Sequence, residues 1–293
     1  MAVTIAVTNQ KGGVGKTATT SALAYILNQR GYKVLSIDLD PQRNLDMLAG
    51  KNVAIPINDL KTPSMLQVLN HECTLKDAII HTELGDLARA SAQLSQWSGR
   101  QILSAAEFNA LKSTPDKLVA FLEERFKIES EKILMGLLPD VEKDYDFILI
   151  DTNPSLTLLT INALYACSYV LSPIFLEASS REAIVELQNT ISTIQYYCPA
   201  HYIRHLGILP VKVATHTTLY KTYLPVIQQL AQKMGTVVFK NGIRQSVVVS
   251  ECMSAHENVM KYQPSSGPAK CYNAFADELI ERVNYLEEAR KNG

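Results

Sequence analysis

A glycine-rich segment near the N-terminus carries the residue types with which proteins bind phosphate groups. Lys11 to Ala18 reads K-G-G-V-G-K-T-A and follows an apolar run at Val3 to Thr8. In phosphate-binding loops, glycines let backbone N–H groups converge on the oxygens, a lysine contacts the β- and γ-phosphates, and a hydroxyl helps to hold Mg²⁺. These parts are supplied in order by Gly12, Gly13, Gly15, Lys16 and Thr17. The segment therefore predicts a nucleotide-binding loop.

The spacing differs from the usual pattern G-x-x-x-x-G-K-[ST], because Gln10 stands at the position of the first glycine. A second lysine, Lys11, precedes Lys16 by five residues. A chance glycine-rich turn is the alternative interpretation. A strand before the loop, a helix after it and two lysines favour a phosphate site, because the N-terminus of a helix attracts anions.

Acidic residues follow two of the predicted strands. Asp38 and Asp40 come after the apolar run Lys33 to Ile37, and Asp151 ends the run F-I-L-I-D. Ligands of α/β sheets bind at the carboxyl ends of the strands, and an acid that ends an apolar strand is typical of a Walker B motif, which holds Mg²⁺. Each acid alone could equally cap the next helix. Together with the loop, they predict one site for a nucleotide and a metal ion.

Three motifs resemble the ParA/Soj family of DNA-partitioning ATPases, within the wider ParA/MinD group of P-loop NTPases. They are K-G-G-V-G-K-T, D-L-D-P-Q-R-N from Asp38 to Asn44, and Y-D-F-I-L-I-D-T-N-P-S-L-T-L-L-T-I-N-A-L from Tyr145 to Leu164. The resemblance covers almost the whole chain and is weakest over about 51–142. It implies a fold of the deviant Walker A type.

The resemblance also implies roles for individual residues in an ATPase that uses ATP and Mg²⁺. Lys11 would be the signature lysine, which crosses a nucleotide-sandwich dimer to touch the partner's phosphates. Thr17, Asp38 and Asp151 would hold Mg²⁺, and Asp40 would position the attacking water. The expected ATP-binding residues are Lys11, Gly12, Gly13, Val14, Gly15, Lys16, Thr17 and Ala18, and the expected catalytic residues are Lys11, Lys16 and Asp40.

Some positions depart from the family pattern. Asn153 replaces the first proline of D-T-P-P-S, and Arg43 replaces the glycine of D-P-Q-G-N. The resulting R-N-L-D, from Arg43 to Asp46, resembles MinD, the membrane-cycling relative. Val248 stands where the family often has a basic residue.

Apolar runs with strand and helix spacing alternate along most of the chain, and this alternation predicts an α/β fold. We expect an open, mostly parallel twisted sheet with helices on both faces, in a single P-loop ATPase domain over 1–293 with a variable helical elaboration at about 51–142. Within that elaboration, Ser64 and Thr74 are typical of helix N-caps, and Glu107 to Leu122 has a helical surface pattern. The expected strands are 3–8, 33–37, 145–150, 169–176 and 206–213, and the expected helices are 17–29, 156–167, 181–197, 219–234 and 271–291.

The last of these helices is predicted to dock on the body of the protein, because its apolar residues share one stripe and its other face is acidic and polar. The stripe consists of Tyr272, Phe275, Leu279, Val283 and Leu286.

Composition is that of an ordinary soluble globular protein, with 293 residues, 47% hydrophobic residues and a net charge of -1. The five cysteines form no C-x-x-C pair, which argues against a disulfide framework or a zinc ribbon. The sequence has neither a targeting segment nor an apolar run near the roughly 18 residues of a spanning helix. We therefore expect a cytoplasmic, nucleoid-associated protein.

Positive charge is concentrated between Ala200 and Lys270, where eight Lys or Arg stand against two acids. Such an excess is typical of solvated surface, but it can also contact phosphate backbones. The expected contacts with non-specific double-stranded DNA are Lys221, Lys240, Arg244 and Lys261.

These observations and the resemblance predict an ATPase that closes as a homodimer with ATP, binds DNA and partitions plasmid or chromosomal DNA. A ParB-like centromere-binding adaptor would stimulate hydrolysis. The alternative is a MinD-like membrane-cycling or other cargo-positioning ATPase. The final segment, Gly267 to Gly293, favours the first function and no membrane partner, because it carries four basic residues against five acids, whereas MinD-type ends are basic and amphipathic.

Overall fold

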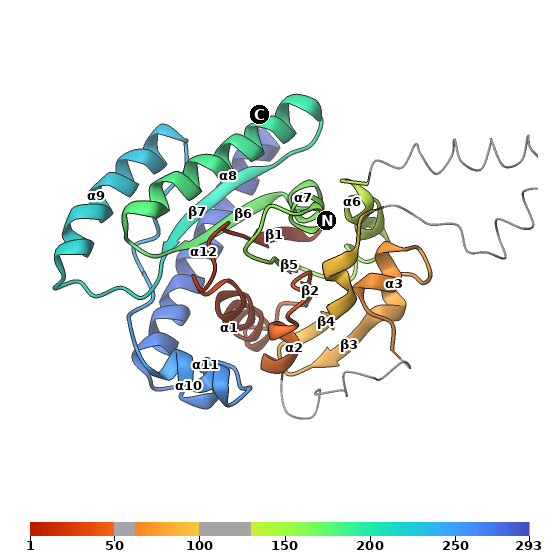
Figure 1. The fold of residues 1–293 in the computed structure, drawn as a ribbon, viewed down its shortest axis with the longest axis horizontal. Coiled ribbons are helices and arrows are strands. Elements are labelled where there is room, and N and C mark those ends of the chain that lie inside the picture. The colour runs from red at the N-terminus through yellow and green to blue at the C-terminus, as the bar shows by residue number, and fades with distance from the viewer. Residues whose placement is uncertain (50–61, 100–129, 293) are drawn as a thin grey trace, which may run out of the picture.

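The computed structural model describes residues 1–49, 62–99 and 130–292. Within them, seven strands form one sheet in the order β3-β4-β2-β5-β1-β6-β7 (Figure 1). β3 and β4 pair antiparallel, and every other neighbouring pair is parallel, which confirms the predicted fold class. The strands are β1 Val3–Val7, β2 Val34–Asp38, β3 Ile79–Thr82, β4 Gly85–Ala88, β5 Phe147–Asp151, β6 Tyr169–Ile174 and β7 Arg204–Pro210.

Helices cover both faces of this sheet. Figure 1 shows α8 in front of the sheet and α12 behind it. The helices of the described residues are α1 Lys16–Gln29, α2 Asn44–Leu48, α3 Met65–Leu69, α6 Ile133–Leu137, α7 Leu158–Ala166, α8 Ala178–Tyr197, α9 Thr218–Lys233, α10 Val248–Ser254, α11 Val259–Tyr262 and α12 Gly267–Asn292, with 3-10 turns at η1 Lys76–Ala78, η2 Ala92–Gln96 and η3 Leu138–Asp140. In the described part of the chain, no helix is long and apolar enough to cross a membrane.

The core is divided by the sheet into two layers, because successive side chains of a strand point to opposite faces. On β1, Ile5 and Val7 belong to the layer beneath α1 and α12, and Ala6 belongs to the layer beneath α3, α6 and α7. Strands covered on both faces are nearly continuous apolar runs, and β5 is buried throughout and apolar from Phe147 to Ile150. A third, smaller cluster holds α9 against β7 through Ile227 and Ile208.

The chain changes direction at the middle of the sheet. α1 leads from β1 to β2, which lies beyond β5 on one side, while β6 pairs with β1 on the other side. Ligands of open α/β sheets bind outside the carboxyl ends of the strands at such a point. The register aligns those ends, since Val7 and Asp38 both pair with Asp151. The fold therefore brings the three segments with predicted chemistry to one edge.

The predicted strands and helices are confirmed within a few residues at their ends. The largest difference is the start of α12, which begins at Gly267 rather than Cys271. The hydroxyl of Ser266 accepts a hydrogen bond from the N–H of Ala269 at 3.3 Å and thereby caps the earlier start.

The predicted apolar stripe of the last helix is confirmed. Four of its members are buried and Leu286 packs half-buried against the same layer of the core. The buried members are Tyr272, Phe275, Leu279 and Val283.

The segment between β2 and β5 differs most from the prediction. Ser64 caps α3 with a full capping box, as expected. The expectation for Thr74 is wrong, because only a 3-10 turn follows it and the N-cap of that turn is Leu75, although the Thr74 hydroxyl accepts from the N–H of Asp77. The β3–β4 hairpin was not predicted, because its strands are four residues each and partly polar. The predicted helical surface at 107–122 lies outside the described residues, so the single domain with its elaboration at about 51–142 stays a prediction.

Candidate active site

The glycine-rich loop connects β1 to α1 and leaves its backbone open to a ligand. Gly13 and Gly15 have φ values of 73° and 77°, in the left-handed region that favours glycine. A Cβ atom at either position would meet nothing within 4 Å. Gly15 is the N-cap of α1, so the free N–H groups of the first helical turn lie at the loop. This arrangement suits an anion.

Lys16 begins α1 and points its ammonium back at the loop. Its Nζ donates to the carbonyl oxygen of Lys11 at 3.2 Å, and the residue is 6% exposed. Burial lowers the pKa of Lys16, while the carboxylates of Asp151 and Asp40 oppose that decrease. The ammonium therefore lies between the loop and the acids of the neighbouring strands.

Asp38 and Asp151 end two adjacent strands, pair in register and are completely buried. Asp38 Oδ1 accepts from the N–H of Asp40 at 2.9 Å, and Asp151 Oδ1 accepts from the hydroxyl of Thr20 at 3.0 Å. The second oxygen of each carboxylate, Oδ2, has no hydrogen-bond partner among the described residues. Buried polar atoms are normally satisfied, so this pair indicates a missing cationic partner.

The electrostatics of the two acids agree with that interpretation. Burial raises the pKa of Asp151 to about 7, although hydrogen bonds from Thr17 and Thr20 oppose the rise. Burial also raises the pKa of Asp38 well above its usual range, and the neighbouring carboxylate of Asp151 adds to the effect. A divalent cation would remove both penalties.

The donor set fits Mg²⁺ held jointly with a nucleotide. Carboxylate and hydroxyl oxygens are the ligands that Mg²⁺ prefers, and it usually keeps several waters and phosphate oxygens as well. Over 1–49, 62–99 and 130–292, no group of three or more His, Cys, Asp or Glu side chains could hold a metal ion. Thr17, Asp38 and Asp151 would therefore need the phosphates to complete the coordination.

Asp40 lies two residues beyond Asp38 and is 6% exposed. Its Oδ1 accepts from the N–H of Gln42 at 3.0 Å, so the carboxylate is held by the turn that follows β2. The carboxylate of Asp40 also acts to raise the pKa of Lys16, the lysine that begins α1.

Lys11 is held within its own chain. Its ammonium forms an ion pair with Glu177, donates to Ser179 Oγ at 2.9 Å and lies 5.8 Å from the centre of the Phe175 ring. These partners lie at or just before the start of α8, more than 150 residues along the chain. No signal in the sequence pointed to them, because Glu177 lies in no recognisable motif.

Another unpredicted residue, Asn9, ties the loop to the sheet. Its side chain accepts from the N–H of Lys11 at 2.9 Å and donates to the carbonyl oxygen of Pro173 at 2.7 Å. Because Asn9 is 4% exposed, these bonds fix the entry of the loop against β6.

A cavity of about 70 Å³ adjoins the loop on the side of α10 and α12. The sequence did not indicate this cavity, since its walls come from distant segments. The lining residues include Gly15, Ala18, Phe175, Lys212, Arg244 and Tyr272.

The four expected DNA contacts do not form one cluster. Lys221 is exposed on α9, at the β7 edge of the sheet, and Arg244 lines the cavity beside the loop. Lys240 is exposed, and its backbone N–H donates to Glu278 at 2.9 Å. Lys261, on α11, forms an ion pair with Glu83 in the β3–β4 turn, at the opposite edge. These residues stay candidates.

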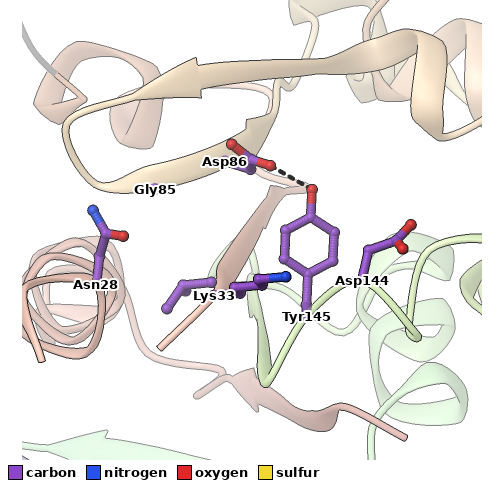
Figure 2. Close-up of a pocket in the computed structure, with 7 residues that line it drawn as sticks. Asn28, Lys33, Gly85, Asp86, Asp144 and Tyr145 are labelled. Carbon is purple, nitrogen blue, oxygen red and sulfur yellow. Dashed lines mark hydrogen bonds between the residues drawn. The ribbon is translucent and has the colours of Figure 1, made fainter. Parts of the chain in front are cut away.

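A larger cavity, of about 320 Å³, lies at the amino ends of the strands (Figure 2). It is lined by residues that begin or precede β2, β4 and β5, among them Lys33, Asp86 and Tyr145. The Tyr145 hydroxyl donates to Asp86 Oδ2 at 2.5 Å, and His81 Nδ1 lies 2.5 Å from Asp86 Oδ1. The glycine-rich loop lies at the other end of the sheet, and the carboxylate of Asp86 already has partners on both oxygens.

Comparisons with known proteins agree with this geometry. A family model described as an AAA domain matches residues 2–201. The sporulation initiation inhibitor protein Soj of Bacillus subtilis is 30% identical over 275 residues, covering 94% of this chain and 97% of that protein. The chromosome-partitioning ATPase Soj of Thermus thermophilus is 30% identical over 279 residues, covering 95% of this chain and 96% of that protein.

A solved structure is similar over the same length. Cobyrinic acid a,c-diamide synthase from Mycobacterium smegmatis, with bound ADP and magnesium, has a TM-score of 0.71 and 27% identity. The match covers 97% of this chain and 96% of the other. The similarity therefore extends beyond the loop to the whole sheet.

Proposed function

We propose that this chain, which belongs to the ParA/Soj family of chromosome-partitioning ATPases, hydrolyses Mg-ATP where β1, β2 and β5 end and couples the reaction to DNA partitioning. The observation that carries the proposal is the buried carboxylate pair of Asp38 and Asp151. Each has an oxygen without a partner in the described part of the chain, beside a glycine-rich loop at a helix N-terminus.

Hydrolysis transfers the γ-phosphoryl group to water. The water oxygen bonds to the γ-phosphorus, the bond to the β,γ-bridging oxygen breaks, and ADP and phosphate leave. Lys16 contacts the β- and γ-phosphates, and Asp40 orients the water. Thr17, Asp38 and Asp151 would hold Mg²⁺, which would neutralise charge on the phosphate oxygens. Positioning and neutralisation account for most of the catalysis of phosphoryl transfer.

The active form is a homodimer with ATP between its subunits. Lys11 of each subunit reaches across to the partner's phosphates. In the single chain, the ammonium of Lys11 is paired with Glu177, so dimer closure requires this ion pair to open. Hydrolysis then removes the γ-phosphate that joins the subunits, and the dimer reopens.

The dimer binds double-stranded DNA without sequence preference, and a ParB-like centromere-binding adaptor stimulates hydrolysis. Support for DNA binding comes from the basic excess between 200 and 270 and from the relatives whose names describe chromosome partitioning. Two subunits double the number of phosphate contacts, so binding requires ATP.

Nucleotide binding and dimer closure are tested by three variants. Lys16→Ala loses ATP binding in calorimetric titration, because the β- and γ-phosphate charge lacks its cation. Lys11→Ala binds ATP but stays monomeric in light scattering, whereas Asp40→Ala accumulates as an ATP dimer. Micromolar ATP affinity of Lys16→Ala contradicts the assignment of the loop, and ATP-dependent dimers of Lys11→Ala contradict the sandwich.

DNA binding is tested by fluorescence anisotropy on random duplexes across a salt series, with ATP or ADP. For two or three contacts per subunit, the slope of log K against log salt is about -4 to -5. Lys221→Glu weakens binding and reduces the slope, while Lys233→Glu, at the other end of the same helix, is the matched control. Preference for anionic vesicles over DNA supports the membrane-cycling alternative instead.

A further inference from the structure

The R-N-L-D segment forms a nearly buried ion pair next to the active site. Nε and Nη2 of Arg43 donate to Asp46 Oδ2 at 3.1 and 2.9 Å. The side chains are only 16% and 7% exposed. Charged hydrogen bonds removed from water are strong when the partners match, and breaking one leaves a buried charge without compensation.

Each member of the pair is unfavourable without the other. Arg43 has a φ of 58°, in the left-handed region that favours glycine, and it stands where the family commonly has glycine. Asp46 is buried, and its Oδ1 has no hydrogen-bond partner within the described ranges. Burial raises the pKa of Asp46, and the guanidinium of Arg43 opposes that rise. The ion pair therefore offsets both costs.

The same turn holds Asp40. The N–H of Arg43 donates to the carbonyl oxygen of Asp40 at 2.9 Å, and the N–H of Gln42 donates to its carboxylate at 3.0 Å. On the other side, the N–H of Asp40 donates to Asp38 at 2.9 Å. A continuous series of hydrogen bonds thus links the end of β2 through Asp40 to the Arg43–Asp46 pair.

We propose that the Arg43–Asp46 ion pair fixes the turn that carries Asp40, which makes Arg43 a positioning residue for ATP hydrolysis. The pair acts on the rate of the hydrolytic step and not on ATP affinity, because neither residue belongs to the loop from Lys11 to Ala18. This inference rests on the proposed role of Asp40 in orienting water.

The test compares Arg43→Gly with the double variant Arg43→Gly/Asp46→Asn. The single variant leaves Asp46 buried without its hydrogen-bonded cation, with only the electrostatic effect of Arg89 opposing the burial of its charge. We therefore expect kcat to fall about 10-fold while the Kd for ATP changes less than about 2-fold. The double variant has neither the strained backbone nor the buried charge, and kcat returns to within about 3-fold of the original. Arg290→Gly is the control, since Arg290 pairs with Glu287 at the same sequence separation on the exposed end of α12.

Hydrogen exchange of the nucleotide-free protein gives a second readout, independent of turnover. The peptide that contains Gln42 and residue 43 exchanges faster in Arg43→Gly, and the double variant recovers protection. Unchanged kcat in Arg43→Gly, or a double variant as slow as the single one, overturns the proposal. If Arg43→Gly does not fold, Asp46→Asn is tested in its place. Unchanged kcat together with unchanged exchange in Asp46→Asn then overturns the proposal.

The proposed function fails in a different way. If Asp40→Ala hydrolyses ATP at the original rate, Asp40 does not orient water, whatever the Arg43 variants do. If Lys16→Ala retains ATP affinity, the nucleotide site itself is wrong. Faster exchange of the turn in Arg43→Gly would still identify the ion pair as its anchor in both cases.

Discussion

Acidic side chains lie at both ends of the parallel strands, but their burial and their hydrogen bonding differ between the two ends. At the carboxyl ends, Asp38 and Asp151 are completely buried, and one oxygen of each has no partner among the residues that the structure describes. At the amino ends, Asp86 is partly exposed, and one of its oxygens accepts from the Tyr145 hydroxyl (Figure 2). Its other oxygen contacts His81. The buried carboxylates at the carboxyl ends are unfavourable for the protein without a ligand, whereas the carboxylate of Asp86 has partners on both oxygens.

This difference supports the proposal that the functional site lies at the carboxyl ends. A fold retains unsatisfied buried charge where a ligand later satisfies it, and such groups are concentrated at functional sites. The cavity at the amino ends is larger, but Asp86 in its wall already has partners on both oxygens, so cavity size and unsatisfied buried charge favour opposite ends of the sheet.

The strongest effect should come from removing the charge of Asp151. Asp151→Asn slows Mg-dependent ATP hydrolysis about 100-fold or more, because the cation loses a carboxylate ligand. The same substitution raises the melting temperature of the nucleotide-free protein, since it removes a buried charge next to Asp38. Phosphate release and calorimetry measure the two effects. Asp86→Asn is the control, for which we expect unchanged hydrolysis and a lower melting temperature. A lower melting temperature of Asp151→Asn would contradict the difference between the acids at the two ends of the sheet.

A pH effect comes from His205, near the amino end of β7. Burial lowers the pKa of His205 to about 4, below an unfolded value of 6.5. The unfolded state therefore binds the extra proton between these values, and His205 by itself lowers the free energy of unfolding by about 3 kcal/mol as pH decreases from 6.5 to 4. Protonation of Asp38 and Asp151, whose pKa values are raised, acts in the opposite sense, so the contribution of His205 is the difference between the original protein and His205→Gln in urea unfolding across this range. The same pH dependence in both proteins would contradict the burial of a neutral imidazole.

A weaker effect is expected at Tyr145, whose hydroxyl satisfies Asp86. Tyr145→Phe lowers the free energy of unfolding by about 1–2 kcal/mol, because a hydrogen bond to a carboxylate is lost. ATP hydrolysis stays unchanged, because this contact lies at the end of the sheet away from the loop. Urea unfolding and phosphate release provide the measurements. Tyr285→Phe is the control, since Tyr285 is 63% exposed on α12. A loss of ATP hydrolysis in Tyr145→Phe would mean that the two ends are coupled.

The weakest effect is expected at His81. Its side chain is 91% exposed although its ring contacts Asp86, and exposed ion pairs contribute little because water screens them. His81→Ala should therefore change the free energy of unfolding by less than about 1 kcal/mol, measured by urea unfolding at pH 7. A change larger than that of Tyr145→Phe would show that His81, and not Tyr145, is the main partner of Asp86.

Features that depend on neighbouring residues could be predicted from the sequence. Glycine spacing and the lysine before Thr17 predicted the loop, since left-handed glycines and a helix N-terminus are local properties of the backbone. Apolar runs predicted the strands, and the acids that end them predicted that Asp38 and Asp151 lie together at one edge, because the carboxyl ends of parallel strands meet there. That this edge binds a metal ion stays a prediction. The short, partly polar β3–β4 hairpin had no such signal.

Contacts between distant side chains came from the tertiary structure alone. The pairing of Lys11 with Glu177, the contact of Lys261 with Glu83 and the cavity beside the loop join segments far apart in the chain. The complete burial of the acids at the carboxyl ends of β2 and β5 is of the same kind, because it follows from how the helices cover the sheet. Local pattern determines the type of each element, whereas these contacts depend on packing, which brings residues together irrespective of their separation in sequence.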